Sequence, residues 1–280
     1  MEERRIVTSE QLEAFHQFLL HEEKSGATIE KYLRDTKAFA AFAGERGVTK
    51  MLVAEYKRWL IERQYAVRSI NSMLASLNCL FRFLGWQDCR VQNLRSQRQT
   101  YCPEERELTK AEYLRLVEAA REKPRLQLLL ETICGTGIRV SELAYFSVEA
   151  VARGEIVVRS KNKTRIILIP SKLRRALLKY AKQECIESGP LFRTRSGMPL
   201  NRSNIWAEMK RLCLLAHVKA TKVFPHNLRK LFARTFYRIE KDIAKLADIL
   251  GHSNIDTTRI YIMTTGQEHR RKIDRLGLVL

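Results

Sequence analysis

The chain has 280 residues, 45% of them hydrophobic, which suits one large domain or two modest ones and excludes an intrinsically disordered chain. Its 51 Lys and Arg outnumber 31 Asp and Glu, and residues 96–280 hold 36 of these basic and 19 of these acidic side chains, an excess that attracts polyanions such as nucleic acid. No stretch approaches the ~20 apolar residues of a membrane span, and the first residues, MEERRIVTSE, lack the apolar segment of a secretion signal, so we expect a cytoplasmic protein without membrane contact.

The first 95 residues predict a small all-helical domain, because apolar residues recur at helical spacing and no long β run interrupts them. Thr8 and Gln11 form a capping box that satisfies free N–H groups at a helix start. The expected helices begin near Thr8 and Ser9, run from about Thr28 to Gly44, begin after Thr49, and run from about Val67 to Leu84.

Residues 90–107 are polar, lack periodicity and contain a proline, which predicts an interdomain linker. We place the linker at 96–107 and a second domain at 108–280. That domain begins with a capping box of Thr109 and Glu112, and helical patterns cover most of it. Its one β pattern is a pair of β-branched runs, GEIVVRS and RIILIP, which predicts a hairpin with KNKT at its tip.

Several common catalytic motifs are missing from the sequence. It contains no GxxxxGK[ST] phosphate loop, no HExxH motif and no DxDxDG calcium loop. The six cysteines form no CxxC pair, which argues against a zinc site and favours reduced thiols in a cytosol. The missing motifs therefore argue against nucleotide hydrolysis and metal-dependent hydrolysis as functions.

What remains is a set of single residues beside helix and strand ends. They are Arg139 after CGTGI, Lys161 and Lys163 in the hairpin tip, His226 and Arg229 in HNLR, His252 in LGH, and Tyr261 in TTRIY. Taken singly, each has an ordinary explanation: an arginine pairs with Glu142 one turn on, a histidine caps a helix, and a tyrosine fills a core.

Taken together, these residue types suit attack on a phosphodiester. Two arginines can neutralise the non-bridging oxygens as charge builds in the transition state. A lysine or histidine can protonate the departing 5′-oxygen, and a tyrosine hydroxyl can attack phosphorus. Because the protein supplies the positive charge, we expect no metal ion or other cofactor.

The words TGIRVSEL, a lysine on a hairpin, HNLRKLFA and LGHSNIDTTRIY, in this order, resemble the tyrosine recombinase (phage integrase) family. The resemblance covers nearly the whole chain. It implies a mainly α fold, with a helical, SAM-like core-binding domain at 1–95 and a mainly α catalytic domain with a small antiparallel β-sheet at 108–280. It implies catalytic roles for Arg139, Lys161, His226, Arg229, His252 and Tyr261, with Glu142 supporting Arg139. Lys161 is preferred because the family's lysine lies near the end of the first strand, although Lys163 also lies on the tip.

The resemblance further implies a site-specific recombinase that cuts and rejoins double-stranded DNA through a 3′-phosphotyrosyl intermediate at Tyr261. Four protomers would act on two DNA sites, with segment 262–280 docking on a neighbouring protomer and accessory DNA-bending proteins as potential partners. Lys230 stands where a histidine is common, and the tail lacks the usual ending of chromosome-dimer-resolving members. We therefore favour integration, excision or resolution for a mobile element, in a bacterial cytoplasm at the nucleoid.

Three other functions stay open. A chromosome-dimer-resolving, Xer-like recombinase would share all the catalytic words. A type IB topoisomerase would relax supercoils without pairing two sites, and a DNA-binding protein without activity would use the same residues only to hold phosphates. The separate helical domain argues against a topoisomerase, and the complete set of catalytic residues argues against an inactive protein.

Overall fold

The computed structural model describes residues 5–95, 104–160, 163–194, 196–263 and 266–278. The chain divides into two compact units, Met1–Arg98 and Gln99–Leu280. The predicted fold class is confirmed, because the described residues are mainly helical and contain one small antiparallel sheet. No helix in these ranges is long and apolar enough to cross a membrane.

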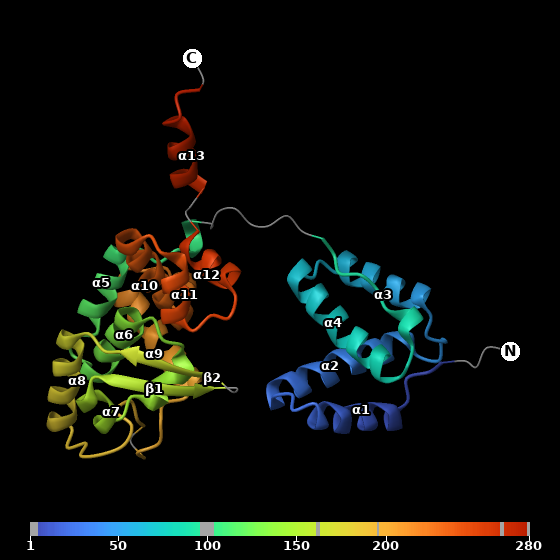
Figure 1. Ribbon diagram of the computed structural model, residues 1–280, viewed down its shortest axis with the longest axis horizontal. Helices are drawn as coiled ribbons and strands as arrows, with labels where there is room; N and C mark the ends of the chain where they lie inside the picture. The colour runs from blue at the N-terminus through green and yellow to red at the C-terminus, as the bar shows by residue number, and fades with distance from the viewer. Residues whose placement is uncertain (1–4, 96–103, 161–162, 195, 264–265, 279–280) are drawn as a thin grey trace. The chain divides into compact units, whose positions relative to one another are not determined.

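The first unit is built from helices alone (Figure 1). Its elements are α1 (Ser9–His21), α2 (Gly26–Ala43), α3 (Lys50–Glu62), α4 (Val67–Phe83) and the 3₁₀ turn η1 (Gln87–Cys89). The predicted capping box of Thr8 and Gln11 is present, and Thr49 caps α3 through its side chain. The second helix begins two residues before Thr28, with Ser25 as its N-cap.

The aromatic core of this unit lies between α2, α3 and α4, where Phe39, Tyr56 and Phe81 are fully buried. Residues 90–95, which lack helical periodicity, still belong to this unit. The side-chain oxygens of Asn71 and Asn78 on α4 accept hydrogen bonds from the backbone N–H groups of Leu94 (2.7 Å) and Val91 (3.1 Å). Two asparagines thus replace the helical hydrogen bonds that this stretch cannot make.

The second unit combines further helices with one hairpin (Figure 1). Its elements are η2 (Glu104–Arg106), α5 (Lys110–Ala119), α6 (Pro124–Thr136), η3 (Val140–Tyr145), α7 (Val148–Arg153), β1 (Glu155–Ser160), β2 (Lys163–Leu168), α8 (Ser171–Gln183), α9 (Arg202–Leu215), η4 (Ala220–Lys222), α10 (Pro225–Glu240), α11 (Ile243–Leu250), α12 (Ile255–Ile262) and α13 (Gly266–Asp274).

Arg139, expected beside a helix end, is the N-cap of the 3₁₀ helix η3. One local expectation was wrong in detail. The hairpin turn is shorter than KNKT, because Ser160 pairs with Lys163 and β2 therefore begins at Lys163. The capping box of Thr109 and Glu112 is present as predicted.

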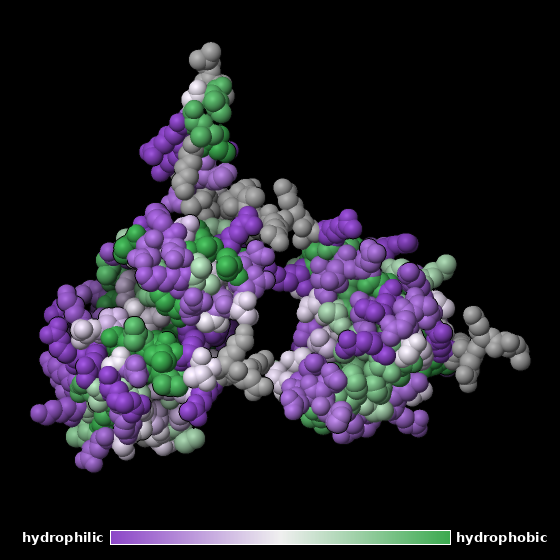
Figure 2. Space-filling view, viewed as in Figure 1, coloured by the Kyte–Doolittle hydropathy of each residue, from purple (hydrophilic) through white to green (hydrophobic). Residues whose placement is uncertain are grey.

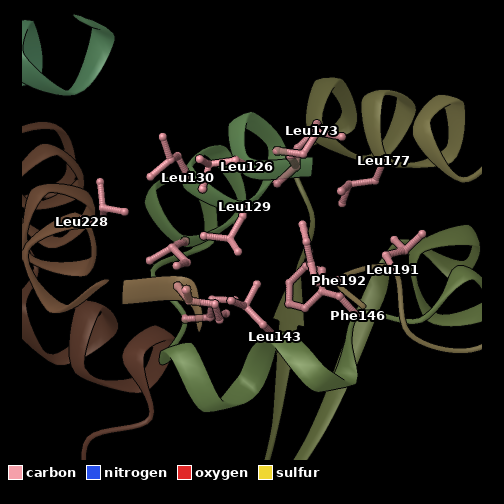
Figure 3. Packing of buried hydrophobic residues seen from close by; sticks show 14 of the residues in the cluster. Leu126, Leu129, Leu130, Leu143, Phe146, Leu173, Leu177, Leu191, Phe192 and Leu228 are labelled. Carbon is pink, nitrogen blue, oxygen red and sulfur yellow. The ribbon is translucent and has the colours of Figure 1, made fainter. Parts of the chain in front are cut away.

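Helix α6 is the central element of this unit (Figure 3). Leu126, Leu129 and Leu130 of α6 are buried against residues from η3, α8, α10 and the segment that contains Leu191 and Phe192. Alternation along the hairpin buries one face and exposes the other. Val157, Ile166 and Leu168 form the exposed face, visible as a hydrophobic patch over the strands in Figure 2.

Candidate active site

Five segments that are distant in sequence meet on one side of the second unit. They are the loop from α6 into η3, the hairpin, the first turn of α10, the turn between α11 and α12, and α12 itself. The helices α10, α11 and α12 pack against one another, and α10 also packs along α6 (Figure 1). Of the residues singled out in the sequence, these segments contain Arg139, His226, Arg229, His252 and Tyr261.

Arg139 is held by the carboxylate of Glu142, as the sequence suggested. Its Nη1 donates to Glu142 Oε1 at 3.1 Å, and its backbone N–H donates to Oε2 at 2.7 Å. Its Nη2 donates to the carbonyl of Gly251 at 3.1 Å, so the guanidinium also reaches the LGH turn. The side chain keeps 44% of its surface exposed, and that exposed part can meet a phosphate.

Arg229 is buried, and both terminal nitrogens of its guanidinium are hydrogen-bonded. Only 2% of the residue is exposed, and its guanidinium donates to the carbonyls of Gly137 and Leu250, each at 2.6 Å. These carbonyls end α6 and α11, where the helix dipoles favour a cation. Burial lowers the Arg229 pKa to about 10, so the side chain is charged at neutral pH.

His252 lies between Arg229 and α12. Its Nε2 is 3.0 Å from Arg229 Nη2, and its Nδ1 is 2.8 Å from Thr258 Oγ1. Because arginine only donates, Nε2 is the acceptor, and Nδ1–H donates to the threonine. Burial, followed by the charge of Arg229, lowers the His252 pKa to about 4, which agrees with a neutral ring.

Helix α12 positions Tyr261. Asn254 caps its start, and Thr258 and Tyr261, three residues apart, are its buried residues. The Tyr261 ring meets the His226 and His252 rings edge to face, with centroids 4.9 and 5.0 Å apart. Tyr261 is 8% exposed. It is therefore a packed ring, as a core tyrosine would be, and it also lies among the charged groups of the site.

The Tyr261 hydroxyl lies 3.3 Å from Nδ1 of His226. His226 is the second residue of α10, after Pro225 at the first helical position, and its ring stacks on Phe224. Burial lowers its pKa to about 4, with further lowering by Lys230 and Arg229. A neutral imidazole at this distance can accept the hydroxyl proton.

An open cleft of about 810 Å³ borders this cluster on the side of Arg139 and His252. Arg139, Tyr145, Arg165 and His252 are among the residues that line it. Lys161 lies outside the described residues. Lys163 is placed as the first residue of β2, but its side chain is not described.

Two residues near the cluster were missed at the sequence level. Arg165 on β2 pairs with Glu142 and is 13% exposed, and Thr258 is fully buried beside His252. Strand alternation could have found Arg165, since it shares a face with the buried Ile167. Thr258 lies three residues before Tyr261, a spacing that places both on one helix face.

The described residues contain no group of three or more His, Cys, Asp or Glu side chains placed to hold a metal ion. The cations of the cluster are instead Arg139, Arg165 and Arg229. Their arrangement suits an anion with several oxygens.

Comparisons with known proteins identify the family of the chain. Two family models match, "Phage integrase family" over residues 106–268 and "Phage integrase, N-terminal SAM-like domain" over residues 12–88. Tyrosine recombinase XerA of Thermococcus kodakarensis is 33% identical over 281 residues, which cover 97% of this chain and 96% of the relative.

Two solved structures share the fold. The Tn1549 transposon integrase in complex with transposon right end DNA has a TM-score of 0.72 at 18% identity, covering 95% of this chain and 99% of that one. A lambda integrase tetramer bound to a Holliday junction has a TM-score of 0.72 at 19% identity, covering 90% of this chain and 76% of that one. With a model match over more than half of its length and a full-length relative, the chain belongs to the phage integrase family of tyrosine recombinases.

Proposed function

We propose that the protein is a site-specific DNA recombinase in which Tyr261 is the nucleophile. The observation that carries the assignment is the Tyr261 hydroxyl 3.3 Å from His226 Nδ1, next to the guanidinium of Arg229, whose central carbon lies 5.8 Å from the tyrosine ring centroid. A hydroxyl, a neutral base and a buried cation at one point are the groups that attack on a phosphodiester needs.

In the cleavage step, Tyr261 Oη attacks phosphorus while His226 Nδ1 takes its proton. The bond from phosphorus to the 5′-oxygen breaks, which leaves a 3′-phosphotyrosyl bond and a free 5′-hydroxyl. Arg139 and Arg229 stabilise the charge on the non-bridging oxygens. Rejoining runs the same steps in reverse with the 5′-hydroxyl of a partner strand, so the bond energy is conserved and ATP is not consumed.

The leaving 5′-oxygen needs a proton, and we assign its donor to the hairpin lysine, Lys161. His252 is less suited, because its Nε2 already accepts from Arg229 and its Nδ1–H points to Thr258. His252 therefore supports Arg229 in the free protein. Lys161→Ala and Lys163→Ala, compared for cleavage, distinguish the two candidate lysines, and the lysine that is not the donor should retain cleavage.

The partner is double-stranded DNA at specific sites. The charge of the second unit supports this, and so does the shared fold with an integrase held in complex with transposon DNA. Four protomers on two DNA sites is the proposed assembly, by analogy with the lambda integrase tetramer on a Holliday junction. Both the helical domain at 1–95 and the catalytic domain at 108–280 are proposed to bind DNA, with accessory DNA-bending proteins as further potential partners.

The segment 262–280 is proposed to dock on a neighbouring protomer. Ile273, Leu276 and Leu278 are 52%, 62% and 83% exposed, and apolar side chains of this kind at a chain end favour contact with another surface. Deleting 275–280 should weaken assembly on DNA while leaving binding to a single site intact.

Two biological roles fit this chemistry. Integration, excision or resolution for a mobile element is the role that we favour, since the tail departs from chromosome-dimer-resolving members. A Xer-like role in chromosome-dimer resolution is the alternative, supported by the full-length similarity to XerA. A cytoplasmic, nucleoid-associated location stays a prediction. A bacterial source also stays a prediction, because the XerA relative comes from Thermococcus.

The deciding experiment uses nicked duplexes, because a nick beside the scissile phosphate lets the short strand diffuse away and traps the adduct. Adduct-forming sequences are first selected from a randomised pool with the wild-type protein. Tyr261→Phe should bind the selected duplex and form no adduct, whereas Tyr180→Phe, at a buried tyrosine on α8, should react normally. Adducts that persist in Tyr261→Phe would refute the assignment, and relaxation of plasmid DNA without recombination would favour a topoisomerase.

A further inference from the structure

Arg165 occupies an unusual place in the hairpin. It pairs with Val158 across the ladder, on the inward face that also buries Ile167. Val158 and Arg165 form the inward-facing pair nearest the hairpin turn whose side chains the structure describes, and Arg165 is 13% exposed. An apolar residue would suit this position, and a buried cation is unfavourable unless it is well paired.

The guanidinium of Arg165 is paired with two other segments of the site. Its Nη2 donates to Glu142 Oε2, the same oxygen that accepts from the backbone N–H of Arg139. Its Nη1 donates to the carbonyl of Ile249 at 2.5 Å, near the end of α11. The Arg165 side chain thus connects β2 to the loop that carries Arg139 and to the turn between α11 and α12 that carries His252.

Gly251 is shaped to receive this arginine. Its φ is +64°, which favours glycine, and a Cβ there would lie 2.6 Å from Arg165 Cδ. The turn that carries His252 is therefore packed directly on the Arg165 stem.

The hairpin depends on such contacts. It consists of two strands that pair only with each other among the described residues, and a two-stranded hairpin is marginal by itself. Near the turn, Tyr145 Oη also donates to the carbonyl of Arg159 on β1 at 2.9 Å, so β1 is held too. Within the part of the hairpin that the structure describes, Arg165 is the residue whose hydrogen bonds reach both Glu142 and α11.

We infer that Arg165 is a positioning residue that fixes the hairpin, and with it the hairpin lysine, relative to Arg139 and the LGH turn. In the sequence, Lys161 lies four residues before Arg165, in the segment that joins β1 to β2, so we expect the orientation of β2 to influence where the lysine is delivered. The inference rests on the proposed function, because it concerns the donor for the leaving 5′-oxygen.

The chain offers a matched control in Arg174 on α8. Its guanidinium donates to the carbonyls of Val151 and Ala152 at the end of α7. It also lies against Gly154, another helix-ending glycine, with φ of +90°. Arg174→Met therefore removes the same kind of helix-end contact in the same unit, away from the site residues.

The test compares wild type, Arg165→Met, Arg165→Lys and Arg174→Met in the full chain. The rate of adduct formation is measured on the selected nicked duplex and on the same duplex with sulfur replacing the bridging 5′-oxygen. With sulfur, the phosphorus–sulfur bond breaks and a thiolate leaves without a proton, so a misplaced lysine matters less. We expect Arg165→Met to react ~100-fold more slowly than wild type on the oxygen duplex and within ~10-fold of wild type on the sulfur duplex.

Arg165→Lys can meet Glu142 but not Ile249 at the same time, so its loss on the oxygen duplex should be smaller and should also be restored by sulfur. This variant decides the matter if Arg165→Met does not fold. Arg174→Met should stay within ~2-fold of wild type on both duplexes. Wild-type rates in either Arg165 variant, or an equal loss on both duplexes, would overturn the positioning role. Failure of the wild-type protein to form an adduct with any sequence of the randomised pool would instead refute the proposed function.

Discussion

The hydroxyl of Tyr261 lies 3.3 Å from Nδ1 of His226, and the two rings meet at 89°. The imidazole is neutral at physiological pH, because burial and the nearby cations lower its pKa to about 4. In the tautomer that carries its proton on Nε2, Nδ1 is an acceptor for the phenolic proton. The pair therefore has the geometry of a nucleophile with its general base.

Replacing His226 with asparagine should slow adduct formation by ~100-fold or more, because general bases contribute about 10²–10⁴ in rate. In wild type the rate should fall at low pH, as His226 takes up a proton and can no longer accept one. A bound phosphate raises the His226 pKa, so this fall should occur above the value of about 4 in the free protein.

The measurement is single-turnover adduct formation from pH 4 to 8. In His226→Asn the fall at low pH should disappear. The control is His217→Asn, at an exposed histidine with φ of +50°, a conformation that asparagine tolerates. A low-pH fall that survives in His226→Asn would contradict the role as base.

The site residues could be predicted from the sequence where a short local motif contains them. Arg139, His226, Arg229, His252 and Tyr261 are brought together as expected. The first four lie near a recognisable helix start or end, and Tyr261 belongs to the motif LGHSNIDTTRIY. Arg165 could not be found in this way, since its importance depends on contacts with Glu142 and Ile249, 23 and 84 residues away. Such long-range pairing is a property of the packed fold, and a single sequence does not contain it.

The secondary structure, too, could be predicted only where the local sequence carries a clear signal. Helices with a capping box or a glycine end, such as α1 and α5, could be placed within a residue or two. The short helix α12 could not, because eight residues carry too little periodicity. The hairpin turn was set too long, because lysine and threonine are polar in a loop and equally acceptable on an exposed strand edge.

Stability should fall as the pH is lowered through the range between about 6.5 and about 4. The pKa of His252 is lowered to about 4 in the folded chain, whereas unfolding returns it to 6.5, so the unfolded state binds the proton first. His226 acts in the same direction, but water around its exposed edge weakens its effect. The contribution is complete above the unfolded value and is lost as the pH approaches the folded value.

The measurement is the free energy of unfolding by urea at several pH values, compared between wild type and His252→Gln. The variant should show a shallower dependence on pH in this range. Burial raises the pKa values of Glu107 and Glu131, which acts in the opposite direction, but both carboxyl groups are present in both proteins. Equal slopes would show that His252 is not buried in its neutral form.

Gly137 should not tolerate alanine. Its φ is +64°, and a Cβ would lie 2.3 Å from Phe232 Cδ1, while its carbonyl accepts from Arg229. Gly137→Ala should lower the free energy of unfolding by about 2 kcal/mol or more and slow adduct formation. Gly189→Ala has a similar φ of +77° but no atom within 4 Å of the added Cβ, so only its backbone strain, about 1 kcal/mol, is expected.

Thr258 should affect reaction rate more than DNA binding. Its buried hydroxyl accepts from Nδ1–H of His252, which keeps Nε2 available to accept from Arg229. Thr258→Val preserves shape but removes this acceptor, so the imidazole loses its fixed tautomer and Arg229 loses a partner. We expect adduct formation to slow by ~10-fold, with binding to the selected duplex unchanged. Thr257→Val, at the exposed neighbour on the same helix, should react like wild type. If both variants lost the same rate, the effect would lie in the stability of α12, and the hydrogen bond to His252 would have no separate role.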